Sequence, residues 1–167
     1  MAIEKAEIEQ EDGVWWWTIP KEKTKNARHA SATDLRVPLL GRAREVVLRR
    51  MQQTDRFLFP SPNARLKYTE QKTISATVYT HQPYAKRRPE NNTPTLKVTH
   101  WTPHDVRRSV RTLLSAMGCP REIAEAVLGH MPGGIVGIYD RHNFDAERLE
   151  WLTKLDARLE QLAQRNP

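Results

Sequence analysis

A capped amphipathic helix beginning at Thr102 is the sequence feature that most constrains the fold. Thr102 is a natural N-cap, Pro103 suits the first helical position, and Asp105 lies in the first turn, where the helix dipole favours an acid. Apolar residues recur at helical spacing along one face of this segment: Val106, Val110, Leu113, Leu114 and Met117. Because such a face must be buried, the sequence predicts a core built around this helix.

Four other segments also have helical patterns. Gly118 ends the first helix, and Pro120 opens a second that ends at Gly129 and directs four residues inward: Ile123, Ala124, Val127 and Leu128. Residues 145–163 are predicted to form a last helix with a leucine stripe: Leu149, Leu152, Leu155, Leu159 and Leu162. Residues 42–53 predict a helix that buries Val46, Val47 and Met51, and residues 73–80 predict a shorter one.

Two short apolar runs predict β-strands. VWWWTI at 14–19 ends at Pro20, and LRVPL follows at 35–39 after a long polar and basic connection. We expect an antiparallel hairpin in which Pro38 marks an edge strand and the three tryptophans, at positions 15–17, serve packing. Residues 82–94 predict a loop, since they contain three prolines and a basic run. The expected fold class is therefore mainly α with a small antiparallel hairpin or sheet (α+β).

The charge distribution points to a polyanion. The chain has 27 Lys and Arg against 20 Asp and Glu, and 20 of the basic residues but only 7 of the acidic ones fall within residues 21–111. This concentration indicates either a nucleic-acid-binding face or a solvated surface, and charge alone does not separate the two. No apolar run approaches the ~20 residues that span a bilayer, and the acidic N-terminus is unlike a signal peptide, so we expect a cytoplasmic protein without membrane contact. A single cysteine, Cys119, excludes an internal disulfide and a multi-cysteine zinc site, and the sequence has no HExxH motif.

Five residues form the candidate active site: Lys25, His104, Arg107, His130 and Tyr139. His104 and Arg107 stand three apart on one helix, so their side chains share a face. Gly129 allows a sharp turn after the next helix, and a glycine-rich stretch then leads to Tyr139. Taken singly, four of these residues have an ordinary structural interpretation: His104 as a helix cap, His130 as a dipole partner, Tyr139 as a structural or surface tyrosine and Lys25 as a solvated lysine. Lys21 and Lys23 are rivals of Lys25. Arg108 and Arg111 are interpreted as DNA-backbone contacts or surface charge.

Together these residues resemble the catalytic domain of tyrosine recombinases, the phage and prophage integrase family. HDVRRS at 104–109 is similar to the family's His-x-x-Arg box, LGHMPGGIVGIYDRH at 128–142 to its Leu-Gly-His box and nucleophilic tyrosine, and residues 17–39 to the hairpin with the family's lysine. The resemblance implies that Tyr139 attacks a DNA phosphate and forms a 3′-phosphotyrosine, without ATP, metal or cofactor. Arg107, His104 and His130 would then stabilise the phosphate, and Lys25 would protonate the leaving 5′-oxygen. The implied partners are double-stranded DNA and other integrase subunits in a tetramer.

One departure from the family pattern sets a further expectation. The resemblance implies another arginine, followed closely by an acid, before the hairpin, yet the first arginine here is Arg28. We therefore expect an N-terminally truncated catalytic domain over residues 1–144 and a C-terminal amphipathic helix over 145–167, with weak or absent recombination by the fragment alone. The alternatives are a DNA-binding remnant without catalysis and an interaction module that docks its last helix on a neighbour.

Overall fold

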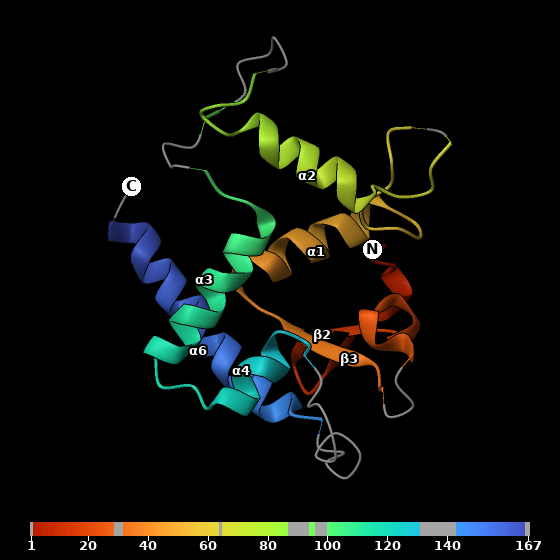
Figure 1. Cartoon of the computed structure of the whole chain (residues 1–167). Coiled ribbons are helices and arrows are strands. Elements are labelled where there is room, and N and C mark those ends of the chain that lie inside the picture. The colour runs from red at the N-terminus through yellow and green to blue at the C-terminus, as the bar shows by residue number, and fades with distance from the viewer. Residues whose placement is uncertain are drawn as a thin grey trace.

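A computed structural model describes residues 2–28, 32–63, 65–86, 94–95, 100–130 and 143–165. Over these residues the chain combines five α-helices with one three-stranded sheet, so the α+β fold class predicted from the sequence is confirmed. Figure 1 shows three helices (α3, α4 and α6) gathered beside the sheet, with α1 between the sheet and α2.

The sheet contains the predicted hairpin and one strand more. Strands β1 (Ile8–Glu11), β2 (Val14–Ile19) and β3 (Leu35–Leu39) pair antiparallel in the order β1-β2-β3. Pro38 lies opposite Trp16 on the edge strand, which confirms the predicted place of the proline. The analysis of the sequence missed β1, although Asp12 and Gly13 both have positive φ (48° and 79°) and form the Asp-Gly turn that typically closes a hairpin.

Among the described residues, three short 3₁₀ turns precede the sheet or lie in the connection between β2 and β3. η1 (Lys5–Glu7) precedes β1, while η2 (Lys21–Lys23) and η3 (Lys25–Arg28) follow β2. The backbone N–H of Lys21 donates to Asp34 Oδ1 at 3.0 Å, which joins the start of the connection to its end beside β3. The first and last parts of the hairpin connection are therefore held together by a hydrogen bond.

Helix α1 (Gly41–Gln53) packs on the sheet and completes the first of two cores. This core holds Ile8, Leu39, Val47 and Leu58. Trp15 and Trp17 pack against it and Trp16 is buried, so the packing role predicted for the tryptophans is confirmed. The predicted burial of Val46 is wrong: its side chain is 36% exposed. The sheet is small, so only one side of α1 has a surface to cover.

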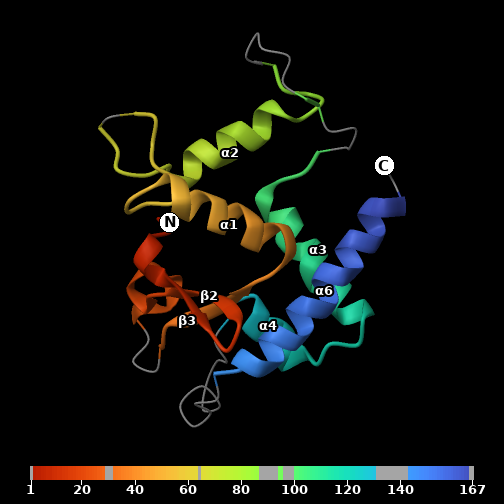
Figure 2. The ribbon, with the colours of Figure 1, turned by 180° about the vertical axis from the view of Figure 1, so that it is seen from behind.

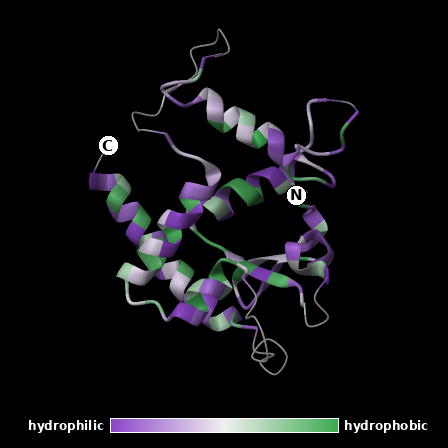
Figure 3. Cartoon of the chain, in the orientation of Figure 1, coloured by the Kyte–Doolittle hydropathy of each residue, from purple (hydrophilic) through white to green (hydrophobic). Residues whose placement is uncertain are grey.

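The second core joins α3 (Pro103–Ala116), α4 (Arg121–Val127) and α6 (Asp145–Arg165) around Leu114, Cys119, Ala124 and Leu155. The predicted N-cap is confirmed, because the Thr102 hydroxyl accepts from the backbone N–H of Asp105 and the Asp105 carboxylate accepts from Thr102 N–H. Figure 3 shows hydrophobic residues on all three helices. Val106 is 52% exposed, contrary to prediction, since it stands in the first turn, ahead of the turns that pack against α4 and α6.

Helix α6 is fastened to the sheet by a buried arginine. Arg148 is 4% exposed, and its Nη1 donates to the backbone oxygen of Arg36 on β3 and to Asp145 Oδ1, both at 2.8 Å. Its Nε donates to Ala126 O on α4 at 3.4 Å. Figure 2 shows α6 running across α3 and α4. The leucine stripe is thus packed within the same chain at Leu155, while Leu159 is 43% exposed.

Helix α2 (Gln71–Thr80) lies on the outer side of α1 in both views (Figures 1 and 2), and most of its residues are exposed. It starts two residues before the predicted helix and ends where predicted. Within the loop predicted over 82–94, residues 82–86 are non-helical and residues 87–93 lie outside the described residues. Among the helices described, none is long and apolar enough to cross a membrane.

Candidate active site

Two of the predicted site residues meet at the junction of α3 and α4. Arg107 lies on the face of α3 that looks toward the end of α4, and its Nη2 lies 2.8 Å from His130 Nε2. The same Nη2 donates to Leu128 O at 2.5 Å. The sequence analysis selected these two residues from the spacing of their motifs, and the structure shows a direct hydrogen bond between them.

A left-handed glycine places His130 beside Arg107. Gly129 has φ +67°, which ends α4 and turns the chain back, as predicted. The backbone N–H of His130 then donates to Glu125 O at 2.9 Å. This bond fixes the position of the His130 backbone relative to α4. The imidazole is half exposed, with a side-chain accessibility of 51%, so a phosphate has access to it.

A carboxylate that the sequence analysis did not select completes this group. Glu125 Oε2 lies 2.5 Å from His130 Nδ1, and its Oε1 accepts from Arg111 Nε at 2.8 Å. These hydrogen bonds, from His130 first and Arg111 second, lower the pKa of Glu125 below its usual value of 4.5. The available signal was an acid on the helix directly before the Leu-Gly-His sequence. Arg111, interpreted from the sequence as a DNA-backbone contact or a surface charge, is thus partly buried and ion-paired within the protein.

His104 lies on the same side of α3 as Arg107, one turn nearer the N-terminus. It occupies the second helical position, after Pro103, and it is exposed. Across the described part of the chain its imidazole has no hydrogen-bond partner. The structure therefore leaves His104 available to a ligand that approaches the N-terminal turn of α3.

Two lysines of the hairpin connection, Lys23 and Lys25, have different surroundings. Lys23 donates to Glu7 and, at 2.8 Å, to Glu4. Burial acts to lower the pKa of Lys23, but the hydrogen bonds to Glu4 and Glu7 together outweigh it and raise the pKa. Lys25 begins η3 and is exposed, and no ion pair to it is found among the described residues. These contacts favour Lys25 over Lys23 as a mobile proton donor. The described contacts do not bring Lys25 to Arg107 and His130, and Tyr139 lies outside the described residues.

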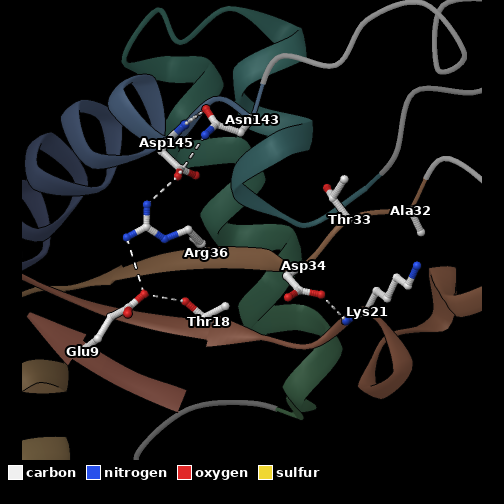
Figure 4. A pocket seen from close by; sticks show the side chains of 9 residues that line it. All are labelled: Glu9, Thr18, Lys21, Ala32, Thr33, Asp34, Arg36, Asn143 and Asp145. Carbon is white, nitrogen blue, oxygen red and sulfur yellow. Dashed lines mark hydrogen bonds and ion pairs between the residues drawn. The ribbon is translucent and has the colours of Figure 1, made fainter. Parts of the chain in front are cut away.

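An open hollow of about 520 Å³ lies apart from these residues, between the sheet and the start of α6. In Figure 4, Arg36 spans it from β3, with Nη1 3.0 Å from Asp145 Oδ2 and Nη2 3.7 Å from Glu9 Oε1. Asn143 donates to the same Asp145 oxygen at 3.2 Å. The carboxylates of Glu9 and Asp145 thus compensate the charge of Arg36, and its ion pair with Asp145 joins β3 to the start of α6. Within the described ranges, no group of three metal-ligating side chains occurs.

The comparison with protein families gives one result that covers most of the chain. The model described as the phage integrase family matches residues 1–146 of 167, a range that includes all five predicted site residues. Searches of curated proteins and of solved structures returned no match. With the family matched over this range, the chain belongs to the phage integrase family, whose members are tyrosine-type site-specific recombinases.

Proposed function

We propose that this chain carries the catalytic domain of a site-specific DNA recombinase, over residues 1–144, and that it cuts and rejoins DNA through a 3′-phosphotyrosine on Tyr139. The observation that carries the proposal is the contact between Arg107 and His130, because it places a guanidinium and an imidazole side by side at a partly exposed surface. Membership of the phage integrase family supports it. We also propose that the chain has the catalytic fold of tyrosine recombinases and that it acts in the cytoplasm.

The cleavage step balances without a cofactor. Tyr139 Oη attacks phosphorus, the Oη–P bond forms, and the bond from phosphorus to the 5′-oxygen breaks. The tyrosine proton passes to a histidine, and Lys25 supplies a proton to the leaving 5′-oxygen. A 5′-hydroxyl from a second strand then attacks the phosphotyrosine, which releases Tyr139 and joins the strands. Because the phosphodiester bond energy is retained in the protein–DNA link, no ATP is needed.

Arg107 suits the phosphate because a guanidinium donates two parallel hydrogen bonds to non-bridging oxygens. In the structure its Nη2 binds Leu128 O and His130, and its Nη1 and Nε have no partner among the described residues. His104, one turn away on α3, would donate to the same phosphate group. The charge that develops in the transition state would thus meet donors from α3, and His130 lies beside them after the end of α4.

Double-stranded DNA is the proposed substrate, and further integrase subunits in a tetramer are the proposed partners. Exposed arginines on α1 and α3, among them Arg44, Arg49 and Arg108, provide positive charge for phosphate contacts outside the site. The C-terminal segment, residues 145–167, would contribute to subunit contacts through the exposed part of α6 near Leu159.

A covalent adduct tests this function. The full chain is incubated with a pool of duplexes of randomised sequence that carry a nick beside the cleavage window, so that cleaved ends diffuse away and the adduct accumulates. We expect a weak protein–DNA band, in keeping with the low activity expected of this chain alone, that survives denaturation and is absent for Tyr139→Phe. Salt-sensitive DNA binding without an adduct would overturn the catalytic proposal and favour a DNA-binding protein without catalysis.

A further inference from the structure

We infer that Glu125 is a positioning residue for the proposed reaction: it holds His130 with the ring proton on Nδ1, so that Nε2 acts as a proton acceptor. The inference rests on the proposed function for its catalytic part, while the state of the imidazole is a property of the protein alone. Glu125 is a residue that neither the His-x-x-Arg box nor the Leu-Gly-His box contains.

Glu125 contacts His130 twice. Its carboxylate lies 2.5 Å from the ring nitrogen Nδ1, and its backbone oxygen accepts from His130 N–H at 2.9 Å. The two contacts together fix both the backbone and the ring of His130, so rotation of the ring about its side-chain bonds is restrained. A single surface ion pair would not impose this restraint.

The partners on the two sides of the ring determine its tautomer. Arg107 Nη2 can only donate, so the Nε2 atom that faces it at 2.8 Å must accept and therefore carries no proton. The neutral ring then carries its proton on Nδ1, where a carboxylate is ready to accept it. A doubly protonated ring would direct an N–H group at the guanidinium. The described contacts thus select the neutral Nδ1–H form.

The second carboxylate oxygen of Glu125 connects this ring to α3. Oε1 accepts from Arg111 Nε at 2.8 Å, and Arg111 Nη1 in turn donates to Ser115 Oγ at 2.5 Å. Arg111 stands one turn beyond Arg107 on the same helix, so one carboxylate sets the spacing between α4 and the helix that carries the phosphate-binding arginine. Both partners of this ion pair are only partly exposed: the side-chain accessibility is 35% for Glu125 and 28% for Arg111.

This arrangement gives His130 a defined role. When Arg107 turns its donors to a bound phosphate, Nε2 is released as an acceptor with its lone pair free. It would take the proton from the attacking tyrosine hydroxyl as the oxygen–phosphorus bond forms. The resulting imidazolium would have the Glu125 carboxylate on its Nδ1–H side, which is the relationship that stabilises the histidine of a Ser-His-Asp triad.

Two readouts on the full chain test the inference. The first is the position of the His130 ring proton, determined from the ¹⁵N shifts of the ring nitrogens by NMR at neutral pH. We expect the Nδ1–H form in the wild type and in Glu125→Gln, whose amide oxygen still accepts. Glu125→Ala removes the acceptor of Nδ1–H and the restraint on the ring, so the ring should turn away from Arg107 and shift to the Nε2–H form, which imidazole favours in water. Glu122→Gln, an exposed acid on the same helix, is the matched control and should leave the ring unchanged.

The second readout is the rate of adduct formation with the nicked duplex pool at saturating DNA. Glu125→Ala should slow it about tenfold to a hundredfold, by analogy with the loss of the carboxylate that orients a metal-bound histidine. Its affinity for DNA and its circular dichroism spectrum should match the wild type. A wild-type ring in the Nε2–H form, or a ring that Glu125→Ala does not change, would overturn the inference. If the ring behaves as expected but the wild type forms no adduct, the proposed function fails and the role of Glu125 in fixing the ring stands.

Discussion

Gly129 lies so close to Leu35 that a Cβ atom on the glycine would be 2.9 Å from Leu35 Cδ2. This approach links the turn before His130 to the first residue of β3, so the sheet supports the site through a contact of one glycine with one leucine. The position also has φ +67°, a conformation that L side chains rarely adopt. The backbone conformation therefore favours glycine here, and a Cβ would in addition require the end of the Leu35 side chain to shift.

We expect Gly129→Ala to destabilise the protein by about 2–3 kcal/mol, from the left-handed conformation and from the displacement of Leu35. Gly118→Ala is the matched control: it also has positive φ, but nothing lies within 4 Å of a Cβ there. The control should lose only about 1 kcal/mol. Urea unfolding of both variants measures the difference, and equal losses would show that the Leu35 contact has no energetic effect.

Two lysines in the first part of the hairpin connection, Lys23 and Lys25, should have separate effects on stability and on activity. Lys23→Met breaks the ion pairs with Glu4 and Glu7, so we expect a lower melting temperature and a loss of about 1 kcal/mol, since the lysine side chain is 27% exposed. Lys25→Met removes an exposed lysine and should leave the melting temperature unchanged. If Lys25 is the general acid, its loss should slow adduct formation about 10²- to 10⁴-fold.

Sulfur in place of the bridging 5′-oxygen provides the chemical control for Lys25. A thiolate leaves without protonation because thiols are far more acidic than alcohols. Lys25→Met should therefore regain most of its cleavage rate on a 5′-phosphorothiolate duplex. A defect of the same size on both substrates would mean that Lys25 binds DNA and does not transfer the proton.

Helix boundaries and the strand hairpin could be predicted because their signals are local. Thr102 and Gly118 mark both ends of α3 by capping chemistry, which does not depend on the rest of the fold. Burial was predicted less well, since it depends on which elements lie opposite. Val46 and Val106 continue an apolar pattern, yet both are exposed: Val46 lies on a side of α1 that the sheet does not cover, and Val106 stands in the first turn of α3, ahead of the packed turns.

The candidate site shows the same division between local and tertiary information. Motif spacing selected Arg107 and His130, and the structure brings them into contact. Glu125 and Arg111 could not be selected, because their roles depend on how α4 packs against α3. A carboxylate on a short helix is usually a solvated group, and only the fold shows that both of its oxygens are hydrogen-bonded. The tertiary positions of Lys25 and Tyr139 relative to these residues stay predictions.

Acid should lower the free energy of unfolding, because it protonates carboxylates that are hydrogen-bonded in the folded protein. The pKa of Glu125 is lowered from 4.5 by His130 and Arg111, and that of Asp105 is lowered from 3.8 by its hydrogen bonds with Thr102. A depressed folded-state pKa contributes stability above the unfolded value, and this contribution is lost as the pH falls through the folded value. We therefore expect the urea midpoint to fall as the pH drops from 5 to about 3. Glu125→Gln should show a smaller fall, and Glu122→Gln the full one.

The buried arginine of α6 should be a main determinant of stability. Arg148→Met fills much of the same volume but leaves Arg36 O without its donor and Asp145 with a partner fewer, so we expect a loss of about 2–4 kcal/mol. Arg158→Met, a change of the same type further along α6, should lower the stability by less than about 0.5 kcal/mol. Thermal unfolding compares the two, and an Arg148→Met variant as stable as the wild type would show that apolar packing alone holds α6 on β3.

Replacement of Arg107 by lysine tests the phosphate clamp with the positive charge retained. Lysine cannot donate two parallel hydrogen bonds from a planar group, so Arg107→Lys should lose about 3–4 kcal/mol of transition-state stabilisation, which is a 10²- to 10³-fold lower rate of adduct formation. Arg108→Lys on the same helix is the control, because Arg108 is 75% exposed and pairs only with Asp105 in the described part of the chain. That variant should keep its cleavage rate. Since Arg107 also donates to Leu128 O, the melting temperatures of both variants are compared, and only a rate loss at unchanged stability assigns the effect to the phosphate. Equal rates for the two lysine variants would mean that Arg107 joins α3 to α4 and has no part in the chemistry.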